Sequence, residues 1–184
     1  FQLDYINTIK PKIAIITNIK KDHLIHHGTY KNYINSKLKI SFFQSAKDFI
    51  ILNYDDHILR KIFYKTKKTK AKVIWVSEKK VLKKGIHINK NALQDNYFER
   101  KTVSLNKSSF LNLSHNRLNT ALSYAALRIF NFETKHTIKK LSLFKGLPHR
   151  LELIGTIKNI DFFNDSKATN VAATCSALDS FEKV

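Results

Sequence analysis

Short apolar segments alternate with segments of helical periodicity over the first half of the chain. Three apolar segments rich in β-branched residues predict short buried strands, at Lys12–Asn18, Asp48–Asn53 and Lys72–Ser77. Between them we expect a polar turn, a helix capped by Thr29 and a second helix, at Ile19–Gly28, Thr29–Phe43 and Asp55–Lys65. Strands that alternate with helices predict an α/β fold with a largely parallel sheet.

The pattern changes after Val81. The stretch Val81–Asn112 is polar and alternating, which predicts a small meander of antiparallel strands. Gly146 and Pro148 mark a boundary, because Gly ends helices and Pro cannot continue them. The elements expected around this boundary are two helices, a hairpin that turns at Lys158-Asn159 and a last helix, at Ser114–Phe130, Thr137–Phe144, Leu151–Phe163 and Asn170–Phe181.

The composition supports a folded and strongly basic chain. Apolar residues make up 43% of the 184 residues, enough for a packed core, and 33 basic against 14 acidic residues give a net charge of +19. Only five of the basic residues are Arg, the residue that makes bidentate contacts to bases and phosphates. Nucleic-acid binding is therefore not favoured as the main role, and a basic binding module is kept as an alternative.

The ends of the chain indicate a piece of a longer protein, and its single cysteine indicates the cellular compartment. The sequence has no Met, begins at Phe1 and stops inside a predicted helix, so we expect a piece cut at both ends. Cys175 alone cannot form an internal disulfide, which favours a reducing, cytoplasmic compartment. No apolar run approaches the roughly 18–20 residues of a membrane span.

Lys37 shares a helix face with Tyr30, Tyr33 and Ile34. A Lys on an apolar stripe usually extends its amine to the edge of the core. The alternative is a partly buried amine with a lowered pKa that reacts with carbon dioxide, and the resulting carbamate can bind a metal.

Two other segments are rich in residues that carry chemistry. His23, His26 and His27 have spacings that zinc ligands use, but no Cys or carboxylate nearby in the sequence completes such a site, and surface histidines are the simpler interpretation. His23, beside a strand end, is the better single candidate for a ligand-binding residue, because ligands bind where chains leave parallel strands.

Asn116 and Asn119 share a helix face. Their amides could contact the edge of a base, or could simply be solvated.

The segment Asn164–Asn170 lies between a predicted strand and a predicted helix. Its polar residues could cap the helix, or Asp165 and Lys167 could meet a charged ligand there. No glycine-rich phosphate loop is present, and the whole chain has four glycines.

Five segments in order resemble the Mur ligases, and among them the branch that adds D-glutamate. They are FQLD at Phe1–Asp4, the run Thr17–Ile40, SHNRLNTALSYAA at Ser114–Ala126, KGLPHRLE at Lys145–Glu152 and NDSKATN at Asn164–Asn170. The resemblance implies a central ATP-binding domain without its P-loop at residues 1–146, followed at 147–184 by the start of a Rossmann-like C-terminal domain. It implies a monomeric, cytoplasmic enzyme that uses ATP, Mg²⁺, D-glutamate and UDP-N-acetylmuramoyl-L-alanine to make peptidoglycan precursors. A non-catalytic remnant of such a ligase is the alternative.

The resemblance also implies roles for individual residues. His23 and carbamylated Lys37 are implied as Mg²⁺ ligands, and Asp4 stands where the family has an assisting Glu, one methylene longer. The residues implied for adenine, ATP and ribose are Asn116, Asn119, Arg150 and Asp165. Lys167 and Thr169 are implied near the γ-phosphate and the carboxylate of D-glutamate.

Overall fold

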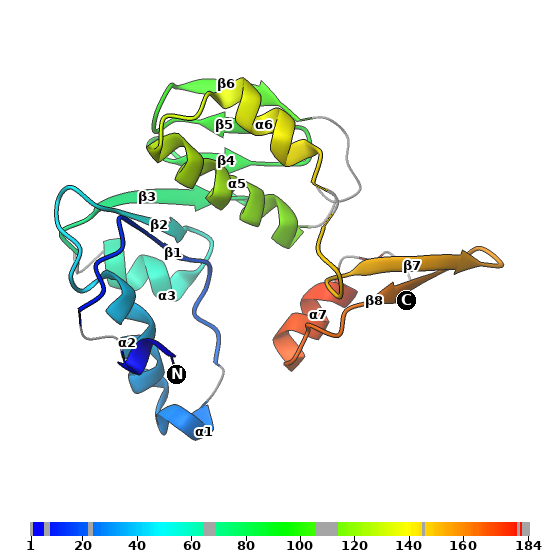
Figure 1. Cartoon of the computed structure of the whole chain (residues 1–184), viewed down its shortest axis with the longest axis horizontal. Coiled ribbons are helices and arrows are strands. Elements are labelled where there is room, and N and C mark those ends of the chain that lie inside the picture. Colours follow the sequence, from blue (N-terminus) through cyan, green and yellow to red (C-terminus); the bar gives the residue numbers. More distant parts are fainter. Residues whose placement is uncertain are drawn as a thin grey trace.

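The computed structural model describes residues 2–5, 8–21, 24–64, 69–105, 114–144, 146–179 and 181. A six-stranded sheet forms the body of the molecule, and a two-stranded sheet lies apart from it (Figure 1). The strands of the larger sheet lie side by side in chain order: β1 Ile13–Ile16, β2 Phe49–Asn53, β3 Lys72–Ser77, β4 Ile86–Ile88, β5 Ala92–Asp95 and β6 Lys101–Ser104.

The first four strands are parallel and the last three form an antiparallel meander, so β4 belongs to both arrangements. These pairings confirm the predicted α/β fold. The periodicity did not reveal the parallel pairing of β3 with β4. The connection 78–85 is short because β4 begins level with the end of β3, where Val76 pairs with Ile86.

The helices lie close to their predicted positions. Their bounds are α1 Leu24–His27, α2 Tyr30–Leu38, α3 His57–Leu59, α5 Ser114–Ile129, α6 Thr134–Ser142 and α7 Val171–Leu178, with 3₁₀ turns η1 Gln2–Tyr5 and η2 Lys39–Ser41 and a π-helical turn η3 Arg60–Tyr64. As expected, Thr29 caps α2, its hydroxyl oxygen accepting a hydrogen bond of 3.1 Å from the backbone N–H of Asn32.

Three helical details differ from the prediction. The segment expected to be only a polar turn contains α1, one turn of helix in which His27 is buried. The helix α2 ends at Leu38 and continues only as the tighter η2 turn. The helix α6 begins three residues early, at Thr134, whose hydroxyl donates a hydrogen bond of 2.9 Å to Glu99 and is nearly excluded from solvent.

Alternating residues of the parallel strands build two cores. Ile50 and Leu52 pack with residues of α2 and α3 on one face of the sheet. Ile51, between them, packs against α5 on the other face. Helices on both faces explain why the strands are apolar throughout rather than alternating.

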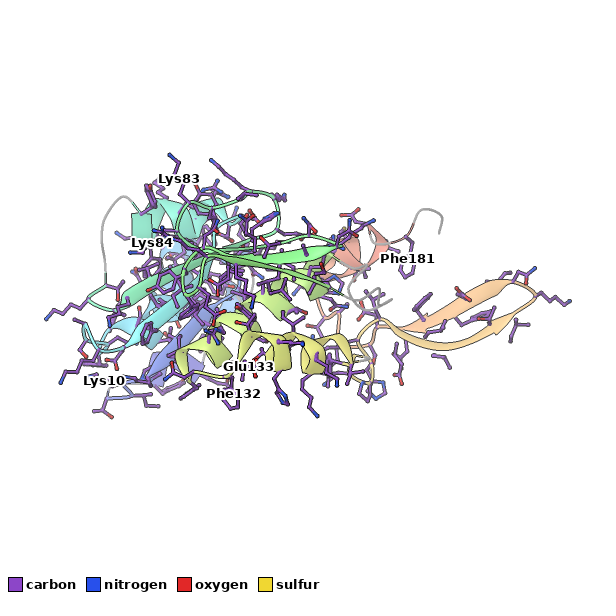
Figure 2. All side chains as sticks on the ribbon, turned by 90° about the horizontal axis from the view of Figure 1, so that it is seen from above. Lys10, Lys83, Lys84, Phe132, Glu133 and Phe181 are labelled. Atoms are coloured by element: carbon purple, nitrogen blue, oxygen red, sulfur yellow. The ribbon has the colours of Figure 1, made fainter. Side chains whose placement is uncertain are left out.

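The second sheet is a hairpin of β7 Glu152–Ile157 and β8 Ile160–Asn164, and it projects from the body (Figure 2). The predicted turn at Lys158-Asn159 is confirmed: both residues have positive φ, 49° and 63°, as a two-residue type I′ turn requires. Within the described residues, no helix combines the length and apolar character needed to cross a bilayer. The domain boundary after Gly146 stays a prediction.

Candidate functional site

A cavity of about 350 Å³ lies where the carboxyl end of β1, the first turns of α5 and the segment between β8 and α7 meet. Ligand sites in proteins commonly have volumes of roughly 300–1,000 Å³. All of the residues implied for nucleotide contacts line it, together with one implied near the γ-phosphate: Asn116, Asn119, Arg150, Asp165 and Lys167. We call it the α5 cavity.

The helix α5 presents Asn116 and Asn119 to this cavity from one face, as their spacing of three predicts. The intervening Arg117 is buried, and its Nε donates a hydrogen bond of 2.7 Å to Oε1 of Glu78, in the connection after β3. This ion pair holds the start of α5 against the sheet and so fixes the direction of the two amides.

Arg150 enters the α5 cavity from a tight loop. Its neighbours His149 and Leu151 both have positive φ, 63° and 46°, which is uncommon for residues other than glycine. Hydrogen bonds hold this conformation: His149 N–H donates to Glu152 over 2.8 Å, and Leu151 N–H donates to Oδ1 of Asp165 over 3.1 Å. Asp165 therefore positions the loop that carries Arg150.

The helix-cap alternative for the segment Asn164–Asn170 is confirmed for one residue. Oδ1 of Asn170 accepts a hydrogen bond of 2.9 Å from Ala173 N–H and caps α7. Lys167 is exposed at the edge of the α5 cavity, and its backbone N–H donates to the carbonyl of His149 over 3.2 Å. Thr169 is exposed and does not line this cavity.

His115 adds an aromatic wall to the same cavity. Burial lowers the pKa of His115 below its ordinary value, while the negative charges of Asp165 and Glu78 oppose that shift. A neutral imidazole is a flat surface with one donor and one acceptor, which suits contact with a planar heterocycle.

Lys37 borders an adjoining cavity of about 230 Å³. Its Nζ donates to the carbonyl of Asn18 over 3.4 Å and lies 5.2 Å from the ring centroid of Tyr33. Asn18 also lines the α5 cavity, as do two residues of α7, so the two cavities share a wall. Lys20 and Lys21 border the Lys37 cavity too, which makes it a positive environment suited to anions.

The structure does not place Asp4 with Lys37. Asp4, in η1, forms ion pairs with His26 and His27 of α1 and with Lys39. A hydrogen bond from Ser36, with the charge of His27 and the contact to His26, lowers the pKa of Asp4 below its usual value. The expectation for His23 lies outside the described residues.

The sequence interpretation found no carboxylate for the histidines of α1, and the structure corrects this. Asp4 lies more than twenty positions before His26 in the chain, so no local spacing could have revealed it. A larger hollow of about 600 Å³, lined by Ser41–Ser45, Thr69 and Lys70, contains none of the residues expected to carry chemistry. The α5 cavity is the better candidate because expected residues from separate segments converge there.

The sequence and the fold of the chain resemble those of known proteins. The model of the Mur ligase middle domain matches residues 2–127. The UDP-N-acetylmuramoylalanine–D-glutamate ligase of Rickettsia bellii is 37% identical over 185 residues, covering 100% of this chain and 41% of that relative. The enzyme of the same name from Clostridioides difficile is 34% identical over 184 residues, covering 100% of this chain and 40% of the relative. The chain thus spans about two fifths of the length of these curated relatives.

Solved structures share the fold at lower identity. A MurF ligase from Thermotoga maritima in complex with ADP superposes with a TM-score of 0.69 at 18% identity, over 93% of this chain and 39% of that one. A murein peptide ligase from Psychrobacter arcticus gives 0.66 at 21% identity, over 93% and 35%. These structures share the fold, and the middle-domain model that matches residues 2–127 shows that the chain belongs to the Mur ligase family.

Proposed function

We propose that the chain is the nucleotide-binding portion of an ATP-dependent ligase that joins D-glutamate to UDP-N-acetylmuramoyl-L-alanine, a step in making peptidoglycan precursors. The names of the relatives support this substrate pair. The observation that carries the proposal is the convergence of Asn116, Asn119, Arg150, Asp165 and Lys167 on one cavity. The cytoplasm is the proposed compartment and a monomer the proposed state, as the family resemblance implies.

The reaction has two steps. A carboxylate oxygen of the alanyl substrate attacks the γ-phosphorus of ATP, the bond to ADP breaks, and an acyl phosphate forms. The amine of D-glutamate then attacks the acyl carbon and loses a proton, and inorganic phosphate leaves as the amide forms. Little of this chemistry needs a protein nucleophile, so the contribution of the chain is positioning and charge stabilisation.

The α5 cavity supplies groups for the nucleotide. The amides of Asn116 and Asn119 each offer a donor and an acceptor, which match the edge of an adenine ring. The free lone pairs of Asp165 accept from the ribose hydroxyls. The guanidinium of Arg150 pairs with phosphate oxygens, a geometry that its planar fork favours.

Other residues act on the reacting groups. Lys167, exposed at the cavity edge, neutralises the γ-phosphoryl oxygens as they move to the substrate. Thr169 contacts the carboxylate of D-glutamate, and His23 is a metal ligand, both as the family resemblance implies.

Mg²⁺, when bound, neutralises phosphate charge during the transfer. Lys37 fits the role of a Mg²⁺ ligand once it is carbamylated. The neutral amine forms a C–N bond with carbon dioxide and loses a proton, and the Lys37 cavity leaves space for the carbamate. Asp4 fits less well, because its carboxylate faces the histidines of α1.

The test uses a complete enzyme that carries this segment. Asn119→Ala should raise the KM for ATP at least tenfold, whereas Asn91→Ala, an exposed asparagine outside the α5 cavity, should not change it. Lys37→Ala should abolish turnover without rescue by bicarbonate. Phosphate release that does not depend on D-glutamate, or equal KM values for the two Asn variants, would refute the proposal.

The chain alone should bind ATP weakly, because its sequence contains no glycine-rich phosphate loop. Tight Mg²⁺-ATP binding would contradict this expectation. Strong, salt-sensitive binding to DNA with sequence preference would favour the basic-module alternative instead.

A further inference from the structure

Asp56 and Tyr30 hold the backbone of Ile19 from two sides. Oδ2 of Asp56, in the connection after β2, accepts a hydrogen bond of 2.9 Å from the N–H of Ile19. The hydroxyl of Tyr30, in α2, donates a hydrogen bond of 3.0 Å to the carbonyl of the same residue. Ile19 itself is 3% exposed and packs in the core that α2 and α3 cover. Both backbone groups of a buried residue are thus fixed, and we call this arrangement the Ile19 clamp.

The residues on either side of the Ile19 clamp border the Lys37 cavity. Asn18, Lys20 and Lys21 all line it, and the carbonyl of Asn18 accepts a hydrogen bond from Nζ of Lys37 over 3.4 Å. The ammonium of Lys21 lies 5.8 Å from the ring centroid of Tyr30, a member of the clamp. Through one buried residue, the clamp therefore places the acceptor for Lys37 and two cations beside it.

The helix α2 holds Lys37 against the same segment. The rings of Tyr30 and Tyr33 stack with their centroids 6.0 Å apart and an angle of 19° between their planes. Nζ of Lys37 lies 5.2 Å from the ring centroid of Tyr33, which is buried. Burial, together with the charge of Asp56, raises the pKa of Tyr30 above its ordinary value, so its hydroxyl keeps its proton and remains a donor. The amine and the clamp thus belong to one ordered cluster.

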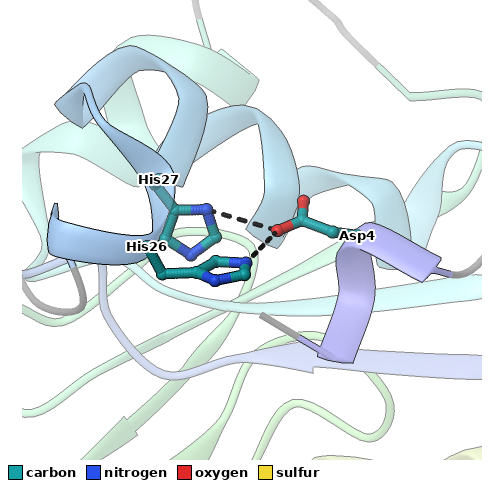
Figure 3. Close-up of side chains that lie close together, drawn as sticks. All are labelled: Asp4, His26 and His27. Atoms are coloured by element: carbon teal, nitrogen blue, oxygen red, sulfur yellow. Dashed lines mark ion pairs between the residues drawn. The ribbon is translucent and has the colours of Figure 1, made fainter.

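The charges around Lys37 favour an anion at this position. Among the described residues that line the Lys37 cavity, the charged ones are Lys20, Lys21 and Lys37 itself. The carboxylate of Asp4 is directed instead at two histidines of α1 (Figure 3). Carbamylation replaces the cation of Lys37 by an anion, which the two neighbouring lysines stabilise. The carbamate nitrogen keeps one hydrogen, which can still be donated to the carbonyl of Asn18.

We propose that Asp56 is a positioning residue for Lys37. By holding Ile19, Asp56 keeps one acceptor and two positive charges in the places where they stabilise the carbamate of Lys37. Without this bond the segment has to become ordered each time the carbamate forms, and the entropic cost disfavours the carbamate. The role of Asp56 rests on the proposed carbamylation of Lys37, and the family resemblance implies no role for Asp56.

The test measures the carbamate on the purified full chain. The chain is equilibrated with ¹³C-labelled bicarbonate, which supplies carbon dioxide, carbamates are trapped as ethyl carbamates with triethyloxonium ion, and peptide mass spectrometry locates them. Lys37 should be labelled at a lower bicarbonate concentration than the exposed Lys158. In Asp56→Ser, the concentration that half-saturates Lys37 should rise at least fivefold. Serine has one side-chain oxygen, so it still caps α3 at the N–H of Leu59 but loses the bond to Ile19.

Two further variants separate positioning from general destabilisation. Tyr30→Phe keeps the stacked ring but removes the other bond to Ile19, so the half-saturating concentration should also rise, by a smaller factor. Tyr124→Phe, which weakens the core on the other face of the sheet, should leave that concentration unchanged. Circular dichroism checks that each variant is folded during labelling, and Tyr30→Phe decides the question if Asp56→Ser does not fold.

A complete enzyme that carries this segment gives a second readout. Asp56→Ser should lose turnover at ambient carbon dioxide and regain it with added bicarbonate, whereas Lys37→Ala should not respond. A carbamate that forms at Lys37 with the same half-saturation in the unchanged chain, Asp56→Ser and Tyr30→Phe would overturn the role of Asp56 alone. Absence of any carbamate at Lys37 would overturn this role together with the proposed carbamylation.

Discussion

Arg117, which is buried, and Glu78, which is partly buried, form an ion pair that ties the first turn of α5 to the connection between β3 and β4. Removing the guanidinium takes an opposite charge away from a carboxylate that is largely shielded from water. Arg117→Met should therefore lower the free energy of unfolding by about 3 kcal/mol, measured by urea denaturation. The Glu78→Gln variant and the double variant complete a double-mutant cycle. This cycle should show a large coupling free energy between the two side chains. A loss of only about 0.5 kcal/mol, typical of surface sites, would contradict this role.

Tyr124 is fully buried, and its hydroxyl donates a hydrogen bond of 2.8 Å to Oδ2 of the equally buried Asp95. Burial, together with this hydrogen bond, raises the pKa of Tyr124 above its ordinary value. Tyr124→Phe should cost about 1–3 kcal/mol of stability, because a buried carboxylate oxygen loses a donor. Tyr64→Phe is the control, since Tyr64 is 68% exposed, and equal stability of the two variants would refute the assignment.

Asp48 should make the fold sensitive to acid. Its carboxylate accepts hydrogen bonds of 2.7 Å from both the backbone N–H and the hydroxyl of Ser45. These bonds, with the charge of Lys10, lower the pKa of Asp48 below 3.8. The folded state therefore favours the ionised form, so this stabilisation is complete above pH 3.8 and is lost as the pH falls through the lower folded value.

Asp48→Asn should consequently flatten the fall of stability below that pH, as measured by urea midpoints over an acid series. Ser45→Ala should have a smaller effect in the same direction, because it removes one of the two donors. An acid profile that both substitutions leave unchanged would show that this carboxylate does not govern the transition.

Gly85 lies where the chain turns into β4. A Cβ atom there would lie 2.6 Å from the backbone carbonyl oxygen of Trp75, which cannot move without disturbing β3. Gly85→Ala should cost about 1–3 kcal/mol. Gly155→Ala is matched to it, since a Cβ atom at that position would meet no atom within 4 Å, and should change stability by less than about 0.5 kcal/mol. Thermal unfolding of the two variants side by side distinguishes these outcomes.

Local chemistry made much of the fold predictable. The Thr29 cap, the turn at Lys158-Asn159 and the apolar strands each depend on residues close together in the chain. The same applies to the shared face of Asn116 and Asn119, which helical spacing alone determines.

Relationships between distant segments were not predictable in this way. The parallel pairing of β3 with β4 depends on where β4 begins, and neither strand encodes that register by its own pattern. The contact of Asp4 with α1 depends on how η1 packs beside α2. Periodicity shows which face of an element is buried, but it does not show which element covers that face.

The α5 cavity takes its walls from both sides of the segment 143–151, with Asn119 before it and Asp165 after it. A molecule that fills the cavity bridges two parts of the chain, because its contacts are complete only when the Arg150 loop and the segment before α7 lie beside the first turns of α5. Occupancy and the relative orientation of these two parts are therefore thermodynamically linked. Substitutions in the connecting segment should alter affinity even where they touch no ligand.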